Sequence, residues 1–220
     1  MPRLPFTAQL DHLVVAAATL EEGEAFIAAR TGATPQRGGK HVAMGTHNSL
    51  LRLGERAYLE IIAIDPDAKA PSRPRWFALD RPSMRATLDA SPRLITWVAR
   101  CDDIDAARAA CTGASGVDPG TVHPMSRDAW RWRITIPDDG MLPAGGAVPA
   151  LIEWLDARHP ADALPDSGAR LATLAAAHPD PASIRTALSA LGLGEALQVT
   201  YDGTPRVGAM LRTRNGPITL

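Results

Sequence analysis

Residues 11–17, DHLVVAA, form a short run that is almost entirely apolar, and residues 94–99, LITWVA, form a second one. Runs of this length and composition are typical of buried strands. Each run leads into a helical pattern, and Thr19 and Asp103 are suitable N-cap residues for the two helices. The chain therefore repeats one strand-then-helix unit, and this repeat decides the fold prediction.

Each unit continues with three more predicted strands. In the first unit they cover residues 41–44, 49–53 and 57–64, and in the second they cover residues 122–125, 130–136 and 149–156. Residues 35–39 are predicted as a turn-rich link and residues 45–48 as a tight turn, because glycine and asparagine favour such backbone. The assignments predict βαβββ modules at residues 1–65 and 93–158, joined by a connector at residues 66–92.

The remaining residues, 159–220, repeat the start of the same pattern. A strand is predicted at residues 169–177, a helix at 181–191 and a hairpin formed by residues 198–201 and 207–213. A unit that packs on its neighbours needs no core of its own, so we expect it to belong to the same domain. The predicted fold class is α+β, with tandem βαβββ modules and a partial third βαββ module.

Composition excludes several function classes. Hydrophobic residues make up 45% of the chain and charged residues 21%, and the net charge is −1. The basic residues are scattered, so no nucleic-acid or anionic-membrane surface is expected. No stretch approaches the roughly 20 apolar residues of a membrane span. Cys101 and Cys111 bracket one predicted helix, too far apart for a disulfide, and free thiols predict a cytoplasmic protein.

Two glutamates stand out because each lies inside an apolar strand. Glu60 lies within residues 58–62 (YLEII), and Glu153 lies within residues 151–155 (LIEWL). A buried carboxylate is unfavourable unless it is paired or binds a metal. One explanation is an ion pair, with Arg52 for Glu60 and with Arg131 or Arg133 for Glu153. The other is a shared pocket, such as a metal pocket, to which His12 contributes.

The order of elements and four short motifs resemble the vicinal oxygen chelate superfamily, most closely its glyoxalase-like branch. The motifs are residues 10–15 (LDHLVV), 39–41 (GKH), 45–48 (GTHN) and 58–62 (YLEII), and the resemblance covers roughly residues 8–158. In that superfamily two modules pair edge to edge, and their sheets curl around a cavity. The resemblance therefore implies a curled mixed sheet around a cavity. Some members bind a divalent metal there, and others have lost the metal and only bind ligands.

The resemblance also implies metal ligands on three strands, namely His12, Glu60 and Glu153. The fourth family position corresponds to Thr96, whose neutral hydroxyl is a poor ligand for a catalytic divalent metal. His41 or His47 would be the replacement. One histidine with two carboxylates suits zinc, nickel, iron or manganese.

Proton transfer at such a site is assigned to an acid–base group. The candidates for this role are Glu153, Glu60, His41 and His47. The candidates for substrate binding are Thr46, Asn48, Thr96 and Trp132. A turn geometry that needs glycine and asparagine is the competing explanation for the 45–48 motif.

The function implied by the resemblance is a metal-dependent lyase or isomerase that acts on a small carbonyl or vicinal-oxygen substrate. The metal would polarise a carbonyl and stabilise an enediolate. A dioxygenase fits less well, because such enzymes usually carry a second histidine where Thr96 lies. The alternative is a non-enzymatic protein that binds a small molecule and has lost the metal. A monomer and a homodimer are both compatible with the sequence, and no nucleic acid or membrane is expected as a partner.

Overall fold

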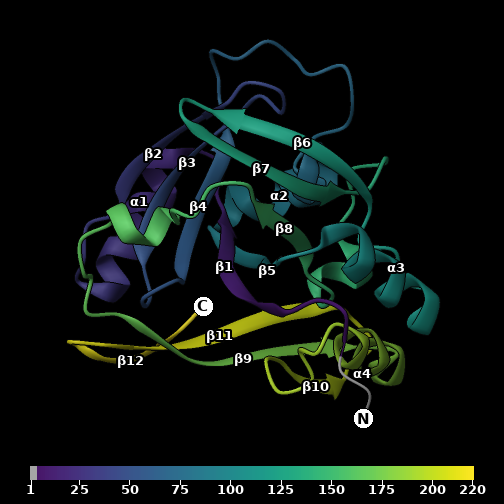
Figure 1. The fold of residues 1–220 in the computed structure, drawn as a ribbon. Coiled ribbons are helices and arrows are strands. Elements are labelled where there is room, and N and C mark those ends of the chain that lie inside the picture. Colours follow the sequence, from purple (N-terminus) through teal and green to yellow (C-terminus); the bar gives the residue numbers. More distant parts are fainter. Residues whose placement is uncertain (1–3) are drawn as a thin grey trace.

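A computed structural model describes residues 4–220 and shows one large and one small sheet (Figure 1). The large sheet has eight strands in the order β2-β3-β4-β1-β5-β8-β7-β6. Its strands are β1 (Ala8–Ala16), β2 (Gln36–His41), β3 (Thr46–Arg52), β4 (Tyr58–Ile64), β5 (Arg93–Cys101), β6 (Thr121–Arg127), β7 (Trp130–Ile136) and β8 (Ala150–Trp154). The predicted α+β class with a curled mixed sheet built from two four-stranded halves is confirmed.

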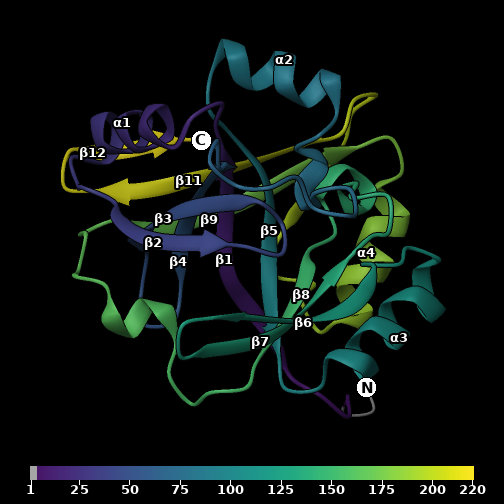
Figure 2. The same cartoon turned by 90° about the horizontal axis from the view of Figure 1, so that it is seen from above.

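The two halves of the large sheet repeat the same wiring. β1 pairs in parallel with β4, and β5 pairs in parallel with β8. The halves join through the antiparallel pair of β1 and β5, which run side by side through the centre of the molecule in Figure 2. The edge strands β2 and β6, at opposite ends of the strand order, approach each other because the sheet curls.

The helices of the two halves begin where the sequence predicts. Helix α1 (Leu20–Thr31) has Thr19 as N-cap, whose side chain accepts from the Glu22 backbone N–H at 3.2 Å. Helix α3 (Ile104–Ser115) has Asp103 as N-cap, whose side chain accepts from the Ala106 backbone N–H at 3.0 Å. Each bond satisfies a donor that the first helical turn leaves free.

The small sheet has the order β10-β9-β11-β12. Its elements are β9 (Arg170–His178), helix α4 (Pro181–Ala190), β10 (Gln198–Tyr201), β11 (Arg206–Thr213) and β12 (Gly216–Thr219). The predicted hairpin of residues 198–201 and 207–213 is wrong, because β10 and β11 lie on opposite sides of β9. The hairpin in this region is formed by β11 and β12.

The two faces of the large sheet pack differently. Leu13, Trp97 and Leu151 face α1, α3 and the small sheet in one continuous core. Val14 and Ile62 lie on the other face, with the connector between the halves. The connector carries the short helix η1 (Trp76–Ala78) and helix α2 (Pro82–Ala90). Two further short helices are η2 (Pro143–Gly146) and η3 (Pro160–Ala163).

The predicted tight turn at residues 45–48 is wrong. The turn lies at residues 42–45, and residues 46–48 already belong to β3, where they pair with both β2 and β4. Strand alternation then places Thr46 and Asn48 on one face and His47 on the other. Likewise the predicted link at 35–39 lies mostly within β2. Within residues 4–220, no helix has the length and apolar character to cross a membrane.

Candidate functional site

A cavity of about 30 Å³ lies on the face of the large sheet that is not covered by α1 and α3. Its polar lining consists of His12, His41, Asn48, Tyr58, Glu60 and Arg127. Four aromatic side chains, Trp76, Phe77, Trp132 and Trp154, also line it. Both halves of the sheet and the connector therefore contribute walls, while all the titratable groups except Arg127 come from the first half.

Neighbouring strands β1 and β4 bring His12 and Glu60 together. The distance between His12 Nε2 and Glu60 Oε2 is 3.7 Å, and both residues are buried. The His12 ring stacks on Tyr58, with centroids 4.5 Å apart and planes at 16°. Burial, with the nearby charges of Asp11 and Glu60, raises the pKa of Tyr58 well above its usual range. The phenol is therefore a neutral wall for the imidazole.

A β-bulge explains how Asp11, the residue before His12, contacts the same imidazole. Adjacent residues of a regular strand point to opposite faces. The β1–β5 register shifts between Leu10 and His12, so Asp11 is the extra residue of a bulge. Asp11 Oδ1 lies 2.6 Å from His12 Nδ1 as a result. The bulge thus converts two consecutive residues into an aspartate–histidine pair.

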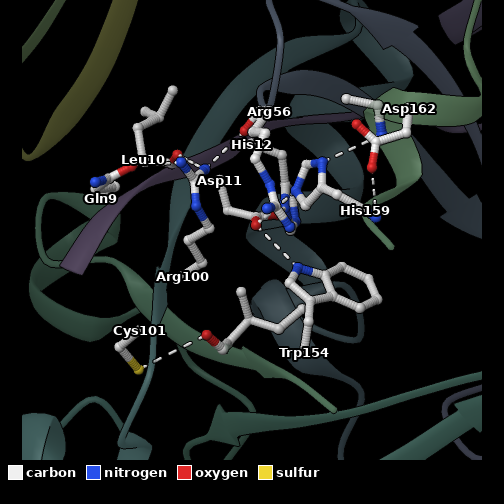
Figure 3. Close-up of polar contacts among 12 residues, drawn as sticks. Gln9, Leu10, Asp11, His12, Arg56, Arg100, Cys101, Trp154, His159 and Asp162 are labelled. Carbon is white, nitrogen blue, oxygen red and sulfur yellow. Dashed lines mark hydrogen bonds and ion pairs between the residues drawn. The ribbon is translucent and has the colours of Figure 1, made fainter. Parts of the chain in front are cut away.

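Three donors converge on the fully buried Asp11 carboxylate (Figure 3). His12 Nδ1 contacts Oδ1, while Trp154 Nε1 and His159 Nε2 each lie 2.9 Å from Oδ2. His159 Nδ1 accepts from the Ala161 backbone, so its Nε2 carries the proton. Burial alone would raise the pKa of Asp11, but the hydrogen bonds from His12 and His159 outweigh it and hold that pKa well below its usual range. Asp11 is therefore a permanent anion that keeps a proton on His12 Nδ1 and leaves Nε2 facing the cavity.

Asn48 connects the remaining polar groups of the cavity. Its Nδ2 donates to Glu60 Oε1 at 2.6 Å and lies 3.4 Å from His41 Nε2, while its Oδ1 accepts from Arg127 Nη1 at 3.2 Å. His41 Nδ1 lies 3.1 Å from Thr46 Oγ1. These contacts occupy Glu60 Oε1 and leave Glu60 Oε2 directed toward His12.

His41 is held in its neutral form. Burial, and then the positive charge of Arg127, lower the pKa of His41 to about 3. A neutral imidazole has one donor and one acceptor nitrogen, which matches donation to Thr46 and acceptance from Asn48. His41 therefore orients the amide of Asn48.

The structure places the other predicted site residues outside this cavity. Glu153 lies on the opposite face of β8, in an ion pair with Arg133 at 2.9 Å. His47 lies beside Lys40 and Asp65 in a separate surface hollow. Of the predicted set, His12, Glu60, His41, Asn48 and Trp132 line the cavity, and Thr46 supports it through His41.

Thr96 does not reach the cavity either. Its hydroxyl donates to the Gly146 carbonyl at 3.2 Å, in the short helix η2. The offset between the two N-cap residues, Thr19 and Asp103, does carry His12 to Thr96, as predicted. Across the β1–β5 ladder, Thr96 pairs with Val14 and Val98 pairs with His12.

Strand register also identifies the second-half counterpart of Glu60. Glu60 pairs with Val14. The alignment of the two halves that matches His12 with Thr96 also matches Val14 with Val98. Val98 pairs with Ala150. Ala150, and not Glu153, therefore occupies the position corresponding to Glu60, and the second half offers no metal ligand at either position.

The donor set does not fit the predicted metal. Two ligands at about 2.1 Å from a metal lie roughly 3.0–3.4 Å apart at octahedral or tetrahedral angles, so the His12–Glu60 spacing of 3.7 Å comes close. A protein site needs at least a third ligand. Within residues 4–220, no group of three or more His, Cys, Asp or Glu side chains is placed to hold a metal ion. His12, Glu60 and Glu153 are not brought together.

Several residues of the site were missed by the sequence analysis. Asp11 was visible as the neighbour of His12, but strand alternation argues against their contact unless a bulge is known. His159 lies beyond the second module, 148 positions from Asp11. Arg127 and Trp154 follow the alternation of cavity-facing residues on β6 and β8, a signal that becomes readable once the register is known.

Comparison with known proteins agrees with this architecture. Residues 10–192 match the family model described as a glyoxalase-like domain. A hypothetical protein from Staphylococcus aureus has a similar fold, with a TM-score of 0.55 at 14% identity over 96% of this chain and 84% of that one. No curated protein matches significantly.

Two methylmalonyl-CoA epimerase structures show weaker similarity. One, in complex with methylmalonyl-CoA and NH4+, has a TM-score of 0.44 at 16% identity over 70% of this chain and 99% of that one. The other, from Mycobacterium tuberculosis, has a TM-score of 0.38 at 19% identity over 66% and 85%. The predicted resemblance to glyoxalase-like proteins is confirmed by the family match. The family match spans most of the chain, and the chain therefore belongs to the glyoxalase-like domain family.

Proposed function

We propose that this protein is a lyase or isomerase that moves a proton at the carbon next to a carbonyl group of a small substrate. The observation that carries the proposal is the pair of His12 Nε2 and Glu60 Oε2, 3.7 Å apart and facing one cavity. Asp11 lies behind the imidazole, keeps a proton on Nδ1 and directs Nε2 into the cavity, as an acid–base group needs a third group to orient it.

The spacing of the pair favours one class of proton transfer. Two groups this close address neighbouring atoms of a substrate, rather than the two faces of one carbon. Glu60 Oε2 takes the proton from carbon, and His12 in its doubly protonated form donates the proton on Nε2 to the adjacent oxygen, where negative charge develops. The Asp11 anion stabilises positive charge on His12 before that step. The product forms when the proton returns to the neighbouring carbon or when a β-substituent leaves.

The metal-dependent form of this chemistry, predicted from the sequence, requires His12, Glu60 and Glu153 around one ion. Glu153 forms its ion pair with Arg133 on the opposite face of β8. We therefore assign each step to side chains of the cavity. Glu60 keeps the acid–base role predicted from the sequence, and His12 becomes an acid–base group in place of a predicted metal ligand. His41, predicted as an acid–base candidate, positions Glu60 together with Thr46 and Asn48.

The experiment is solvent exchange. The protein is incubated in D2O with pyruvate, 2-oxobutanoate and hydroxyacetone, and loss of the C–H signal is followed by proton NMR. Exchange above the uncatalysed rate is expected for at least one compound, with a loss of 100-fold or more in His12→Gln and Glu60→Gln. Glu55→Gln is the matched control, because Glu55 is exposed in the turn of the hairpin that carries Glu60. Full exchange activity in both cavity variants would refute the assignment.

The second candidate is a non-enzymatic protein that binds a small molecule. The four aromatic side chains of the cavity favour it, because aromatic walls are typical of ligand pockets. It predicts saturable binding of a compound from the panel without any exchange. This result would replace the enzymatic proposal.

A further inference from the structure

The cavity ends at a guanidinium group that has no carboxylate partner. Arg127 lies at the end of β6, and its Nη1 donates to the neutral Asn48 Oδ1 at 3.2 Å. No ion pair of Arg127 is found within residues 4–220, whereas Arg133 on the adjacent strand pairs with both Asp105 and Glu153. A partly buried guanidinium with five donors is only partly satisfied by one amide oxygen. This end of the cavity is therefore suited to an anion.

The opposite strand makes room for this arginine. Strand β2 approaches β6 and carries Gly38 and Gly39. A Cβ on Gly39 would lie 2.8 Å from Arg127 Cδ, and a Cβ on Gly38 would lie 2.2 Å from Asn48 Oδ1. Both glycines thus allow Arg127 to cross the edge strand and reach Asn48. The arginine closes the gap between the two ends of the curled sheet.

The cavity is too small for a substrate while Arg127 contacts Asn48. Its volume of about 30 Å³ holds a few water-sized groups, whereas a ligand site for a small molecule is roughly ten times larger. Arg127 has a long side chain with several rotatable bonds and lies beside the two-residue turn of the β6–β7 hairpin, so a change of rotamer would widen the cavity without moving a strand. An anion that replaces Asn48 as its partner would both bind Arg127 and enlarge the space.

The charges of the cavity fix the orientation of such a ligand. Asn48 separates Arg127 from Glu60, since its oxygen faces the guanidinium and its nitrogen faces the carboxylate. Glu60 repels an anionic group, so that group must lie at the arginine end. The rest of the ligand then extends toward Glu60 Oε2 and His12 Nε2, where the proton is moved.

We propose that Arg127 binds a carboxylate of the substrate, so that the substrate class is a small carbonyl compound bearing a carboxylate. This inference rests on the proposed function. A planar carboxylate matches the guanidinium with two parallel hydrogen bonds and fits a narrow cavity lined by flat rings better than a tetrahedral phosphate does. Arg127 is thus the specificity-determining residue of the site.

The test is direct binding, which needs no turnover. Calorimetry measures the affinity of the wild type for pyruvate, for its neutral analogue hydroxyacetone and for inorganic phosphate. Pyruvate is expected to bind at least tenfold more tightly than either. Arg127→Gln is expected to weaken pyruvate binding at least tenfold and to leave hydroxyacetone unchanged, and Arg127→Lys is expected to fall between. Arg131→Gln, exposed on the same hairpin, is the matched control and should bind as the wild type does.

The outcomes separate this inference from the proposed function. Pyruvate binding that depends on Arg127, without solvent exchange, would support the inference and refute the enzymatic proposal. Exchange of pyruvate that is unchanged in Arg127→Gln would refute the inference alone. Equal affinity for pyruvate and hydroxyacetone, tighter binding of phosphate, or no binding of any of the three would also overturn it. The unfolding temperature of Arg127→Gln confirms that the variant is folded.

Discussion

The neutral state of His41 makes the stability of the fold depend on pH in a way that can be measured. Burial and the charge of Arg127 lower its pKa to about 3, against about 6.5 in an unfolded chain. Below pH 6.5 the unfolded state takes up this proton and the folded state does not. The stabilisation is therefore fully present above pH 6.5 and is lost as the pH falls toward 3. Between pH 6.5 and 4 the loss is about 3 kcal/mol, at roughly 1.4 kcal/mol per pH unit.

The assay is urea unfolding of the wild type and of His41→Gln at several pH values from 7 to 4. Glutamine keeps one donor and one acceptor for Thr46 and Asn48 but cannot take up a proton. The variant is expected to be less stable at pH 7, because the ring leaves a packing defect. The wild type should lose about 3 kcal/mol more than the variant over the pH range. The readout is the difference between the two proteins in how steeply the free energy of unfolding changes with pH. The packing defect lowers the stability of the variant equally at every pH and therefore does not affect this difference.

Other groups titrate in the same range, and the comparison of the two proteins removes their contribution. His41→Asn provides a second variant with the same hydrogen-bonding groups and a different shape. Equal pH dependence in the wild type and in both variants would show that His41 is protonated in the folded protein. The tautomer assigned to it, and the orientation of Asn48 that follows, would then be refuted.

Two further perturbations test the support of the site. Asp11→Asn replaces a charged acceptor of three hydrogen bonds by a neutral group. At about 1 kcal/mol for each bond, urea unfolding at pH 7 should show a free energy of unfolding lower by about 3 kcal/mol. A decrease below about 1 kcal/mol would contradict the hydrogen-bond network around Asp11. Gly38→Ala places a Cβ against Asn48 Oδ1 and should destabilise by roughly 1–3 kcal/mol and shift the Asn48 side-chain amide signals in NMR spectra. Gly54→Ala is its control, because that Cβ meets only Ala57 at 3.9 Å, and equal effects of the two would refute the close contact.

The sequence predicted the parts of the fold that depend on contacts between residues close together in the chain. The capping residues Thr19 and Asp103 mark helix starts by contacts within one turn. His12 and Glu60 were found because β1, α1 and the strands up to β4 follow each other with short connections. The predicted hairpin in the small sheet was wrong for the opposite reason. The parallel pairing of β10 with β9 depends on contacts between residues far apart in the sequence, and the turn at residues 202–203 does not indicate it.

The site was predicted in part, and the misses share a physical origin. The resemblance implies Glu153 as a cavity residue, whereas the ladder pairs Val98 with Ala150, three residues before Glu153. A shift by an odd number of residues reverses the face of every side chain on a strand. Asp11 was missed because a bulge depends on the partner strand, and Arg127 because its position depends on the curl of the whole sheet.

The two halves of the sheet contribute different kinds of residues to the cavity. In the proposed function the first half supplies the acid–base pair His12 and Glu60. The residues at the corresponding positions of the second half are Thr96 and Ala150, which have no acid–base side chain. The second half instead supplies Arg127 and aromatic walls, and residues just beyond it supply His159 to hold Asp11. Under these proposals, one half contributes the acid–base groups and the other contributes the group that binds the substrate carboxylate. Because residues from both halves line the cavity, the proposed site requires both halves of the sheet.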